Sequence, residues 1–207
     1  MPEHQPVRFA LTMNTLYYGD NLKILREYIS DESVDLIYLD PPFNSNRSYN
    51  VLFKDETGQD ADAQLTAFDD SWHWGPAAEG TFHHIAANAP LNVGKMIGAL
   101  REFIGDNQMM AYLVMMAARL VELHRVLKPT GSLYLHCDPT ASHYLKVLLD
   151  SVFGFENFKN EILWKRKTGR GDTGGTSGKF GNMTDVLLFY GKGQRTTFHQ
   201  LLRPNDP

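Results

Sequence analysis

The chain has 207 residues and a net charge of −4, and it is 43% hydrophobic and 21% charged, which fits one soluble globular domain with a substantial core. No apolar run approaches the ~20 residues of a membrane span, and the first ten residues lack the apolar core of a signal peptide, so we expect no membrane association. The single cysteine, Cys137, excludes a disulfide within the chain and favours a reducing cytoplasm.

The first predicted elements are a short strand at residues 16–18, which ends at Gly19, and a helix with apolar residues at positions 22, 24, 25 and 29. Asp20 or Asn21 can cap this helix, because a side-chain oxygen accepts hydrogen bonds from the first free N–H groups. Asp20 could also accept a hydrogen bond from a cofactor hydroxyl or amine. The residues by themselves favour capping.

A second strand is predicted at residues 34–39, where an apolar run rich in β-branched and aromatic side chains is typical of a strand buried on both faces. The run ends in Asp40-Pro41-Pro42-Phe43. Because proline lacks an N–H and has a fixed φ, the strand must end there. We therefore expect the Asp40 carboxylate at the carboxyl end of a central strand, where open α/β sheets keep their active sites.

This corner of the backbone suits a substrate that offers an amino group. Ionised Asp40 only accepts hydrogen bonds, and the Pro41 carbonyl adds a second acceptor beside it. Together they would draw hydrogen bonds from the exocyclic amine of a base and free its lone pair for attack, while Phe43 offers a flat face for stacking. A turn that merely ends a strand is the alternative, which the full DPPF sequence makes the weaker interpretation.

Residues 44–90 predict a long polar connection, a lid or insertion. It begins with Asn44, Ser45, Asn46 and Arg47, whose donors suit a phosphate or a base edge. Residues 68–74 concentrate aromatic side chains and form either a lid over the pocket or a local hydrophobic anchor.

Two helices are predicted at residues 95–104 and 107–127, and the four methionines of the second helix are expected in the core. A strand at residues 132–136 then leads into His136-Cys137-Asp138, followed by a helix that Thr140 is expected to cap. Adjacent strand residues point to opposite faces, so we expect no metal site at this triplet. His136 and Asp138 are instead expected at the rim of the cleft that holds Asp40.

The end of the chain is basic. Residues 159–195 contain eight Lys or Arg and three Asp or Glu, a local charge of +5, which is typical of a face that meets phosphate but also of a solvated loop. Between strands predicted at residues 161–165 and 185–190, residues 167–184 predict a flexible glycine-rich loop that contacts a nucleic-acid backbone or is simply disordered. The Walker pattern fails there, because Thr173 replaces a glycine and Phe180 follows Lys179. The candidate DNA-binding residues are Asn44, Ser45, Asn46, Arg47, Lys165, Arg166, Lys167 and Arg170.

Several of these segments resemble the β-class amino-methyltransferases of DNA, site-specific enzymes found mostly in restriction–modification systems. The resemblance extends over about residues 16–195 and is carried by the segments YGDN at 18–21, DESVDLIYLDPPFN at 31–44, FDDSW at 68–72, LKPTGSLYLHCD at 127–138 and NEILWKR at 160–166. It implies S-adenosyl-L-methionine as methyl donor, with Gly19, Asp20 and Asp40 beside the cofactor. The catalytic motif it implies is Asp40-Pro41-Pro42-Phe43.

The resemblance implies a Rossmann-like methyltransferase of the α/β class, and the alternation of elements predicts a largely parallel sheet. The family's cofactor-binding segment, Phe-x-Gly-x-Gly, is missing from the sequence. We therefore expect residues 1–207 to be the N-terminal catalytic part of a single, incomplete domain, or a truncated reading frame.

The activity implied is methylation of adenine N6 in double-stranded DNA, because an Asp-led tetrapeptide goes mainly with adenine in this family, with the base flipped out of the duplex. Cytosine-N4 methylation and an inactive DNA-binding remnant are the alternatives. Candidate partners besides DNA are a restriction subunit and a second copy of the chain.

Overall fold

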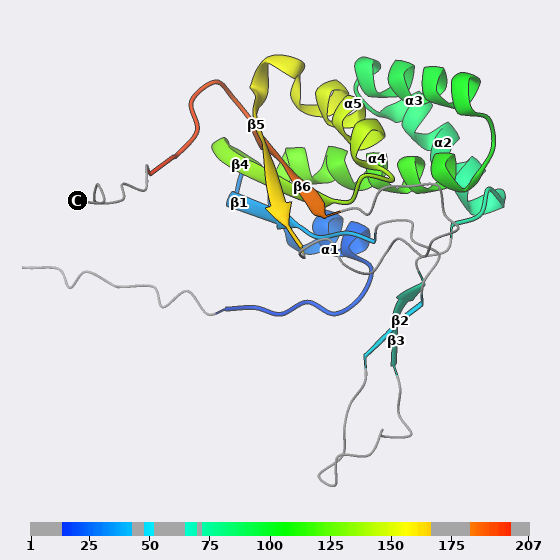
Figure 1. The fold of residues 1–207 in the computed structure, drawn as a ribbon, viewed down its shortest axis with the longest axis horizontal. Helices are drawn as coiled ribbons and strands as arrows, with labels where there is room; N and C mark the ends of the chain where they lie inside the picture. Colours follow the sequence, from blue (N-terminus) through cyan, green and yellow to red (C-terminus); the bar gives the residue numbers. More distant parts are fainter. Residues whose placement is uncertain (1–13, 43–47, 52–64, 70–71, 167–182, 200–207) are drawn as a thin grey trace, which may run out of the picture.

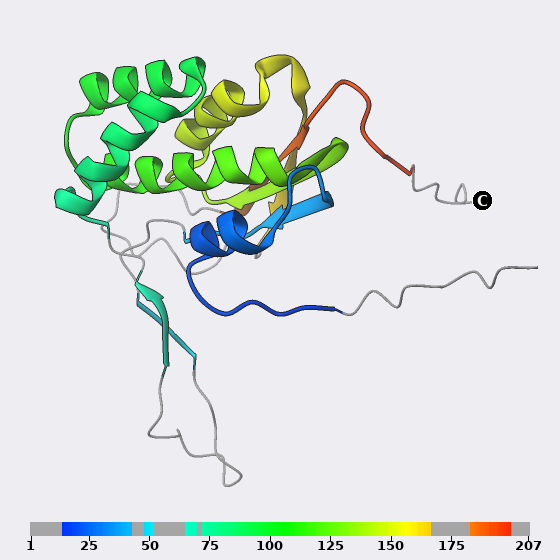
Figure 2. The same ribbon diagram turned by 180° about the vertical axis from the view of Figure 1, so that it is seen from behind.

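The computed structural model describes residues 14–42, 48–51, 65–69, 72–166 and 183–199 of the chain. These residues form a four-stranded sheet with helices packed on it and a separate two-stranded ribbon (Figures 1 and 2). The α/β class expected from the sequence is confirmed. None of the described helices is both long and apolar enough to cross a lipid bilayer.

The order of the main sheet is β1 (Val34–Leu39), β4 (Leu127–Cys137), β6 (Thr184–Gly191) and β5 (Phe158–Lys165). β1 is parallel to β4, but β6 is antiparallel to both of its neighbours. Among the described strands, β1, β4 and β5 therefore run in one direction, as expected for a largely parallel sheet, and β6 alone runs opposite to them. A loop can join antiparallel neighbours such as β5 and β6, whereas parallel strands need a crossover, as α5 (Ser142–Phe153) provides between β4 and β5.

β1 lies at the edge of this sheet, not at its centre as expected. Residues 16–18, expected as a strand, pair with no described strand, and the Leu16 side chain is 96% exposed. Leu36 and Tyr38 are also more than half exposed, so β1 is not buried on both faces. An apolar run predicts an extended segment, but its neighbours in space decide pairing and burial.

Helices α2 (Pro76–Asn88), α3 (Leu91–Ile104), α4 (Gln108–Val126) and α5 lie together on one side of the sheet (Figure 1). α4 supplies much of the core, and its Met110 and Met116 are fully buried, which confirms the core position expected for them. The Asn107 side chain caps α4 by accepting a hydrogen bond from Met110 N at 2.9 Å. α3 begins at Leu91, four residues before its expected start.

The long connection expected at residues 44–90 contains three regular elements. β2 (Ser48–Val51) and β3 (Leu65–Asp69) pair as an antiparallel ribbon that projects from the rest of the chain in both views (Figures 1 and 2). α2 follows and packs against α3 and α4. Its sequence has weak apolar periodicity, and tertiary contacts stabilise it instead: Ile85 is buried, and the Arg101 guanidinium lies 4.4 Å from the centre of the Phe82 ring.

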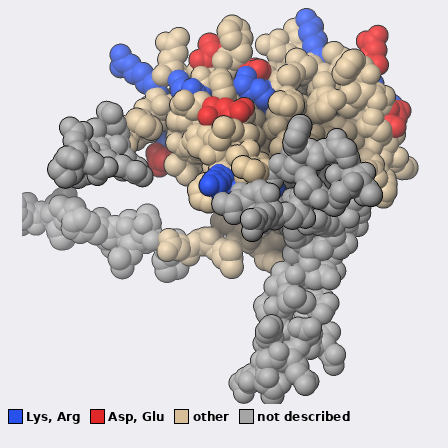
Figure 3. Space-filling view, viewed as in Figure 1, with Lys and Arg blue, Asp and Glu red and all other residues tan. Residues whose placement is uncertain are grey.

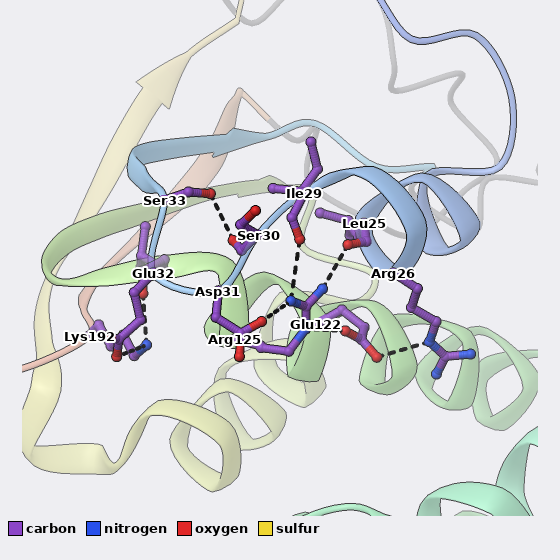
Figure 4. A network of polar contacts seen from close by, with 11 residues as sticks. Leu25, Arg26, Ile29, Ser30, Asp31, Glu32, Ser33, Glu122, Arg125 and Lys192 are labelled. Atoms are coloured by element: carbon purple, nitrogen blue, oxygen red, sulfur yellow. Dashed lines mark hydrogen bonds and ion pairs between the residues drawn. The ribbon is translucent and has the colours of Figure 1, made fainter.

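A network of polar contacts holds α1 (Asn21–Tyr28) and the start of β1 against α4 (Figure 4). Arg125 of α4 donates hydrogen bonds to the carbonyls of Leu25 and Ile29, and it also pairs with Asp31 and Glu122. The hydrogen bond with Glu122 raises the pKa of Arg125. Burial raises the pKa of the Glu122 carboxyl, but its hydrogen bonds with two arginines outweigh burial and lower it. The α4 helix thus positions the strand that carries Asp40.

The sheet face opposite these helices carries a row of aromatic side chains, of which Tyr38 is exposed and Phe189 is buried. Register places Tyr38, Tyr134 and Phe189 in one row across β1, β4 and β6, and the rings of Tyr134 and Phe189 are stacked with centroids 4.4 Å apart. The next row toward the carboxyl ends of β1 and β4 leads from Asp40 to His136, because Leu39 pairs with Leu135. The candidate catalytic carboxylate therefore lies level with a histidine of the neighbouring strand.

Candidate active site

Asp40 directly follows the last residue of β1, Leu39, at the carboxyl end of the strand, as expected. Its side chain is 60% exposed. Pro41 and Pro42 continue the chain without regular structure and are partly buried. Phe43 lies outside the described residues, so its stacking role stays a prediction.

A cavity of about 500 Å³ opens beside this strand end. Its volume lies within the usual range for small-molecule sites, roughly 300 to 1,000 Å³. The walls come from the turn before α1, from the end of β1, from α4 and from Trp72. The lining residues are Gly19, Asp20, Asn21, Leu39, Asp40, Pro41, Pro42, Trp72, Met115, Met116 and Arg119.

A second cavity of about 270 Å³ adjoins the first one, since both are lined by Asp20, Trp72, Met115 and Arg119. Trp72 also packs edge-on against Tyr112, with ring centroids 6.0 Å apart. Trp74, by contrast, lies beside Phe82 and the Arg101 guanidinium. The aromatic run at residues 68–74 thus contributes a cavity wall through Trp72 and a hydrophobic anchor through Trp74.

Asp20 caps α1, as the residues alone favoured, and its Oδ1 atom accepts a hydrogen bond from Leu22 N at 3.0 Å. The same oxygen lies 2.6 Å from a guanidinium nitrogen of Arg119, whose Nε donates to Asn21 at 2.8 Å. Gly19 precedes this turn with a φ of 135°, a conformation that favours glycine. Gly19 and Asp20 are therefore held at the cavity wall by α4.

His136 lies between two carboxylates, one of them Asp40, but neither His136 nor Asp138 is among the residues that line the cavity, where both were expected at the rim. His136 Nδ1 is 3.0 Å from Asp40 Oδ1, and His136 Nε2 is 3.3 Å from Asp185 Oδ2. Asp185 is nearly fully buried, and Arg166 pairs with it through Nε at 3.1 Å. Asp138 instead accepts hydrogen bonds from the backbone and hydroxyl of Thr140, so the expected Thr140 cap is replaced by an Asp138 turn before α5.

Cys137 is buried on the opposite face of β4 from His136. Burial raises the pKa of the Cys137 thiol to about 12, and the negative charges of Asp138, Glu161 and Asp185 act in the same direction. A thiol with such a pKa is a poor nucleophile at neutral pH. Within the described parts of the chain, no group of three or more His, Cys, Asp or Glu residues is arranged to hold a metal ion.

The candidate DNA-binding residues are only partly described. Lys165 ends β5 and is exposed, and the Arg166 guanidinium is engaged by Asp185. On the face in Figure 3, the described Lys and Arg side chains are interspersed with Asp and Glu and form no patch of one sign. The other candidates lie outside the described residues: Asn44, Ser45, Asn46, Arg47, Lys167 and Arg170.

Comparison with known proteins shows to which family this chain belongs. Residues 34–206, most of the chain, match the family model described as DNA methylase, a model of N6 and N4 methyltransferases. The chain belongs to this DNA methylase family. Membership confirms the resemblance found in the sequence and S-adenosylmethionine as the cofactor of the family.

This DNA methylase chain is similar to the Mod subunit of the type III restriction-modification enzyme StyLTI from Salmonella typhimurium, with 30% identity over 156 residues, 74% of this chain and 20% of that protein. It is 32% identical to the type II methyltransferase M.EcaI from Enterobacter cloacae over 96 residues, 46% of this chain and 21% of the relative. The chain thus spans about a fifth of these relatives.

Among solved structures, the PvuII DNA methyltransferase, which is cytosine-N4-specific, aligns over 87% of this chain and 49% of its own, with 11% identity and a TM-score of 0.48.

Sequence reasoning about this methylase chain missed two residues at the site. Arg119 lines both cavities, and the available signal was a charged residue within the apolar first part of α4, between Met109 and Leu120. Asp185 is a charged residue at the start of a buried strand, and a buried carboxylate needs a partner. Both partners, Asp20 and His136, are distant in sequence.

Proposed function

We propose that this chain forms the catalytic part of a DNA methyltransferase of a restriction–modification system, which transfers a methyl group from S-adenosyl-L-methionine to the N6 amine of adenine. One observation carries the proposal: the Asp40-Pro41-Pro42 segment lines a cavity of about 500 Å³ at the carboxyl end of β1. Family membership supports the reaction class. The adenine preference rests on the Asp that begins the tetrapeptide.

The residues around the cavity fit such a cofactor. S-adenosylmethionine carries a sulfonium and an ammonium group, and the carboxylates of Asp20 and Asp40 both line the cavity. Gly19, Asp20 and Asp40 are the residues that we assign to it. The cofactor supplies an electrophilic methyl group.

The chemistry left to the chain is to hold and activate the amine. Asp40 accepts a hydrogen bond from one N–H of the amine, and the Pro41 carbonyl accepts a hydrogen bond from the other. These two bonds localise the lone pair on the amine nitrogen. The amine nitrogen would take the methyl group as the bond between that group and the sulfonium sulfur breaks, which leaves a neutral thioether, and the nitrogen then releases one proton to water. Positioning and electrostatics therefore provide most of the rate enhancement, and no covalent enzyme intermediate is needed.

The adenine must leave the duplex to reach this cavity. Phe43 would stack on the flipped base, and the eight candidate DNA-binding residues would contact phosphates or base edges. Among these residues, Arg166 already pairs with buried Asp185, whereas Lys165 is exposed. We therefore expect the Lys165 ammonium group to contact a phosphate more readily than the Arg166 guanidinium. Neutralising one phosphate contributes about −0.9 to the slope of log affinity against log salt concentration, so Lys165→Ala should reduce the slope by about one.

The decisive experiment assays methyl transfer from tritiated cofactor to duplex DNA, with the chain in its full natural polypeptide. Asp40→Ala should lower turnover by at least a hundredfold, because the amine loses its charged acceptor. Glu102→Gln, which removes an exposed carboxylate on α3, is the matched control and should keep wild-type turnover. Near wild-type turnover by Asp40→Ala would show that the catalytic assignment is wrong.

Mass spectrometry of the digested DNA separates the two amines. N6-methyladenine is the expected product, and N4-methylcytosine would correct the base assignment while leaving the reaction class intact. Strong, salt-sensitive DNA binding without calorimetric binding of the cofactor would instead identify a DNA-binding remnant.

A restriction subunit is the partner that we propose, since several relatives are named as Mod subunits of type III restriction-modification enzymes. Co-expression with the product of a neighbouring restriction gene, followed by size-exclusion chromatography, tests this. The same chromatogram reports whether the methylase dimerises.

A further inference from the structure

A line of polar contacts crosses the whole sheet at the end that carries Asp40. Arg166, which follows β5, pairs with Asp185 of β6 through Nε at 3.1 Å and through a second guanidinium nitrogen at 3.3 Å. Asp185 lies 3.3 Å from His136 Nε2 on β4, and His136 Nδ1 lies 3.0 Å from Asp40 at the end of β1. Each of the four strands thus contributes one residue, which lies in the strand or directly follows its last residue.

Strand register explains how these four side chains meet. His136 pairs with Leu187, so Asp185, two residues away on β6, points to the same face. Arg166 N donates to Met183 O, which continues the β5–β6 pairing by one step and places Arg166 beside Asp185. His136 is not among the residues that line the cavity, whereas Asp40 is. The histidine therefore holds Asp40 from outside the cavity.

The two ends of the line differ in exposure. The side chain of Asp185 is 4% exposed and that of His136 17%, whereas that of Asp40 is 60% exposed. An exposed carboxylate on a strand end rotates among several rotamers unless a contact selects one of them. The buried Asp185 side chain is held in one conformation by its pair with Arg166. The imidazole ring of His136 is rigid, so a ring that contacts Asp185 through one nitrogen also fixes where its other nitrogen meets Asp40.

We propose that His136 is a positioning residue for methyl transfer: it anchors Asp40 Oδ1 to the buried Asp185–Arg166 pair and leaves the other oxygen of Asp40 for the substrate amine. This inference rests on the proposed function of Asp40. An imidazole that carries protons on both ring nitrogens donates to both carboxylates at once, whereas neutral imidazole donates to one. The anchored Asp40 carboxylate is already in the rotamer that accepts a hydrogen bond from the amine. This orientation raises turnover and leaves substrate affinity nearly unchanged.

Two substitutions separate the two halves of the contact. The side-chain amide of asparagine can place its nitrogen near the position of a histidine Nδ1, and that of glutamine near the position of Nε2. His136→Asn therefore keeps a donor toward Asp40 and loses the one toward Asp185. His136→Gln keeps the donor toward Asp185 and loses the one toward Asp40.

The assay measures kcat and KM for DNA and cofactor in the full natural polypeptide, with His143→Asn as control. His143 is an exposed histidine on α5. His136→Gln should lower kcat by about a hundredfold, as a displacement of about 1 Å in a reacting group can do, and His136→Asn should keep at least tenfold more kcat than His136→Gln. Both KM values should change less than about threefold. A merely structural role would lower thermal stability in both variants and give them equal kcat.

Equal kcat in the two variants, or a loss confined to KM, would overturn the positioning role while Asp40→Ala still reports on the catalytic assignment. If the wild-type protein transfers no methyl group to DNA, the proposed function fails, and crystal structures of the two variants decide the anchoring by themselves. Asp40 should keep its rotamer in His136→Asn and leave it in His136→Gln. An unmoved Asp40 in both structures would refute the proposal.

Discussion

The Arg119 guanidinium of α4 lies 2.6 Å from Oδ1 of Asp20, the residue that caps α1. The two residues come from positions 99 apart in the sequence and line both cavities. The pair thus connects the α1 turn to α4 at the place where we assign the cofactor.

Arg119→Met should weaken cofactor binding by about tenfold, because the Asp20 carboxylate loses the cation that orients it. The stability change should be small, about 0 to 1 kcal/mol, since the Asp20 side chain is 57% exposed. Calorimetric titration with S-adenosylhomocysteine measures the affinity. Arg26→Met, which breaks an ion pair with Glu122 away from the cavities, is the control. Equal affinities in Arg119→Met and wild type would exclude Asp20 from cofactor binding.

His124 should make the folded state less stable as the pH falls. Burial lowers the pKa of its imidazole, the Lys192 charge lowers it further, and the Glu32 charge acts in the opposite direction. A depressed pKa means that the unfolded chain takes up the proton first, so this contribution to stability is complete above pH 6.5 and is lost as the pH falls toward the folded-state pKa.

Thermal unfolding between pH 7.5 and pH 5 tests this dependence. His124→Phe keeps an aromatic ring edge-on to Phe153, whose ring centroid lies 5.0 Å away, and should flatten the acid side of the stability curve. An unchanged slope in His124→Phe would assign the acid sensitivity to other groups.

Gly131→Ala should destabilise the fold by about 1 to 3 kcal/mol through overpacking. A Cβ at this position would lie 3.0 Å from the Asp35 carbonyl oxygen and 2.7 Å from Leu127 Cδ1, where β4 passes close to the irregular start of β1. Gly80→Ala is the matched control, because a Cβ at this position in α2 would meet nothing within 4 Å. This substitution should stabilise the folded state by roughly 0.5 to 1 kcal/mol. Chemical denaturation measures both, and equal effects would contradict the close approach.

Local rules predicted several features correctly. Asp20 caps α1, and β1 ends before the two prolines. Each of these features depends on residues within a few positions of one another, because caps satisfy neighbouring N–H groups and proline removes its own donor. The sheet could not be derived in the same way: β6 carries an apolar run that would suit either strand direction, and its antiparallel position between β4 and β5 depends on pairing across the fold.

The sequence by itself determined the chemistry of the strand end: an acceptor-only carboxylate at Asp40, followed by two imino acids that stop the strand. Only the tertiary structure decided what surrounds that carboxylate. His136, Asp185 and Arg119 come from elements far apart in the chain, and their contacts with Asp40 and Asp20 depend on strand order and helix packing. Local propensity acts over a few residues, whereas the geometry of a site is set by the long-range pairing that places those residues side by side.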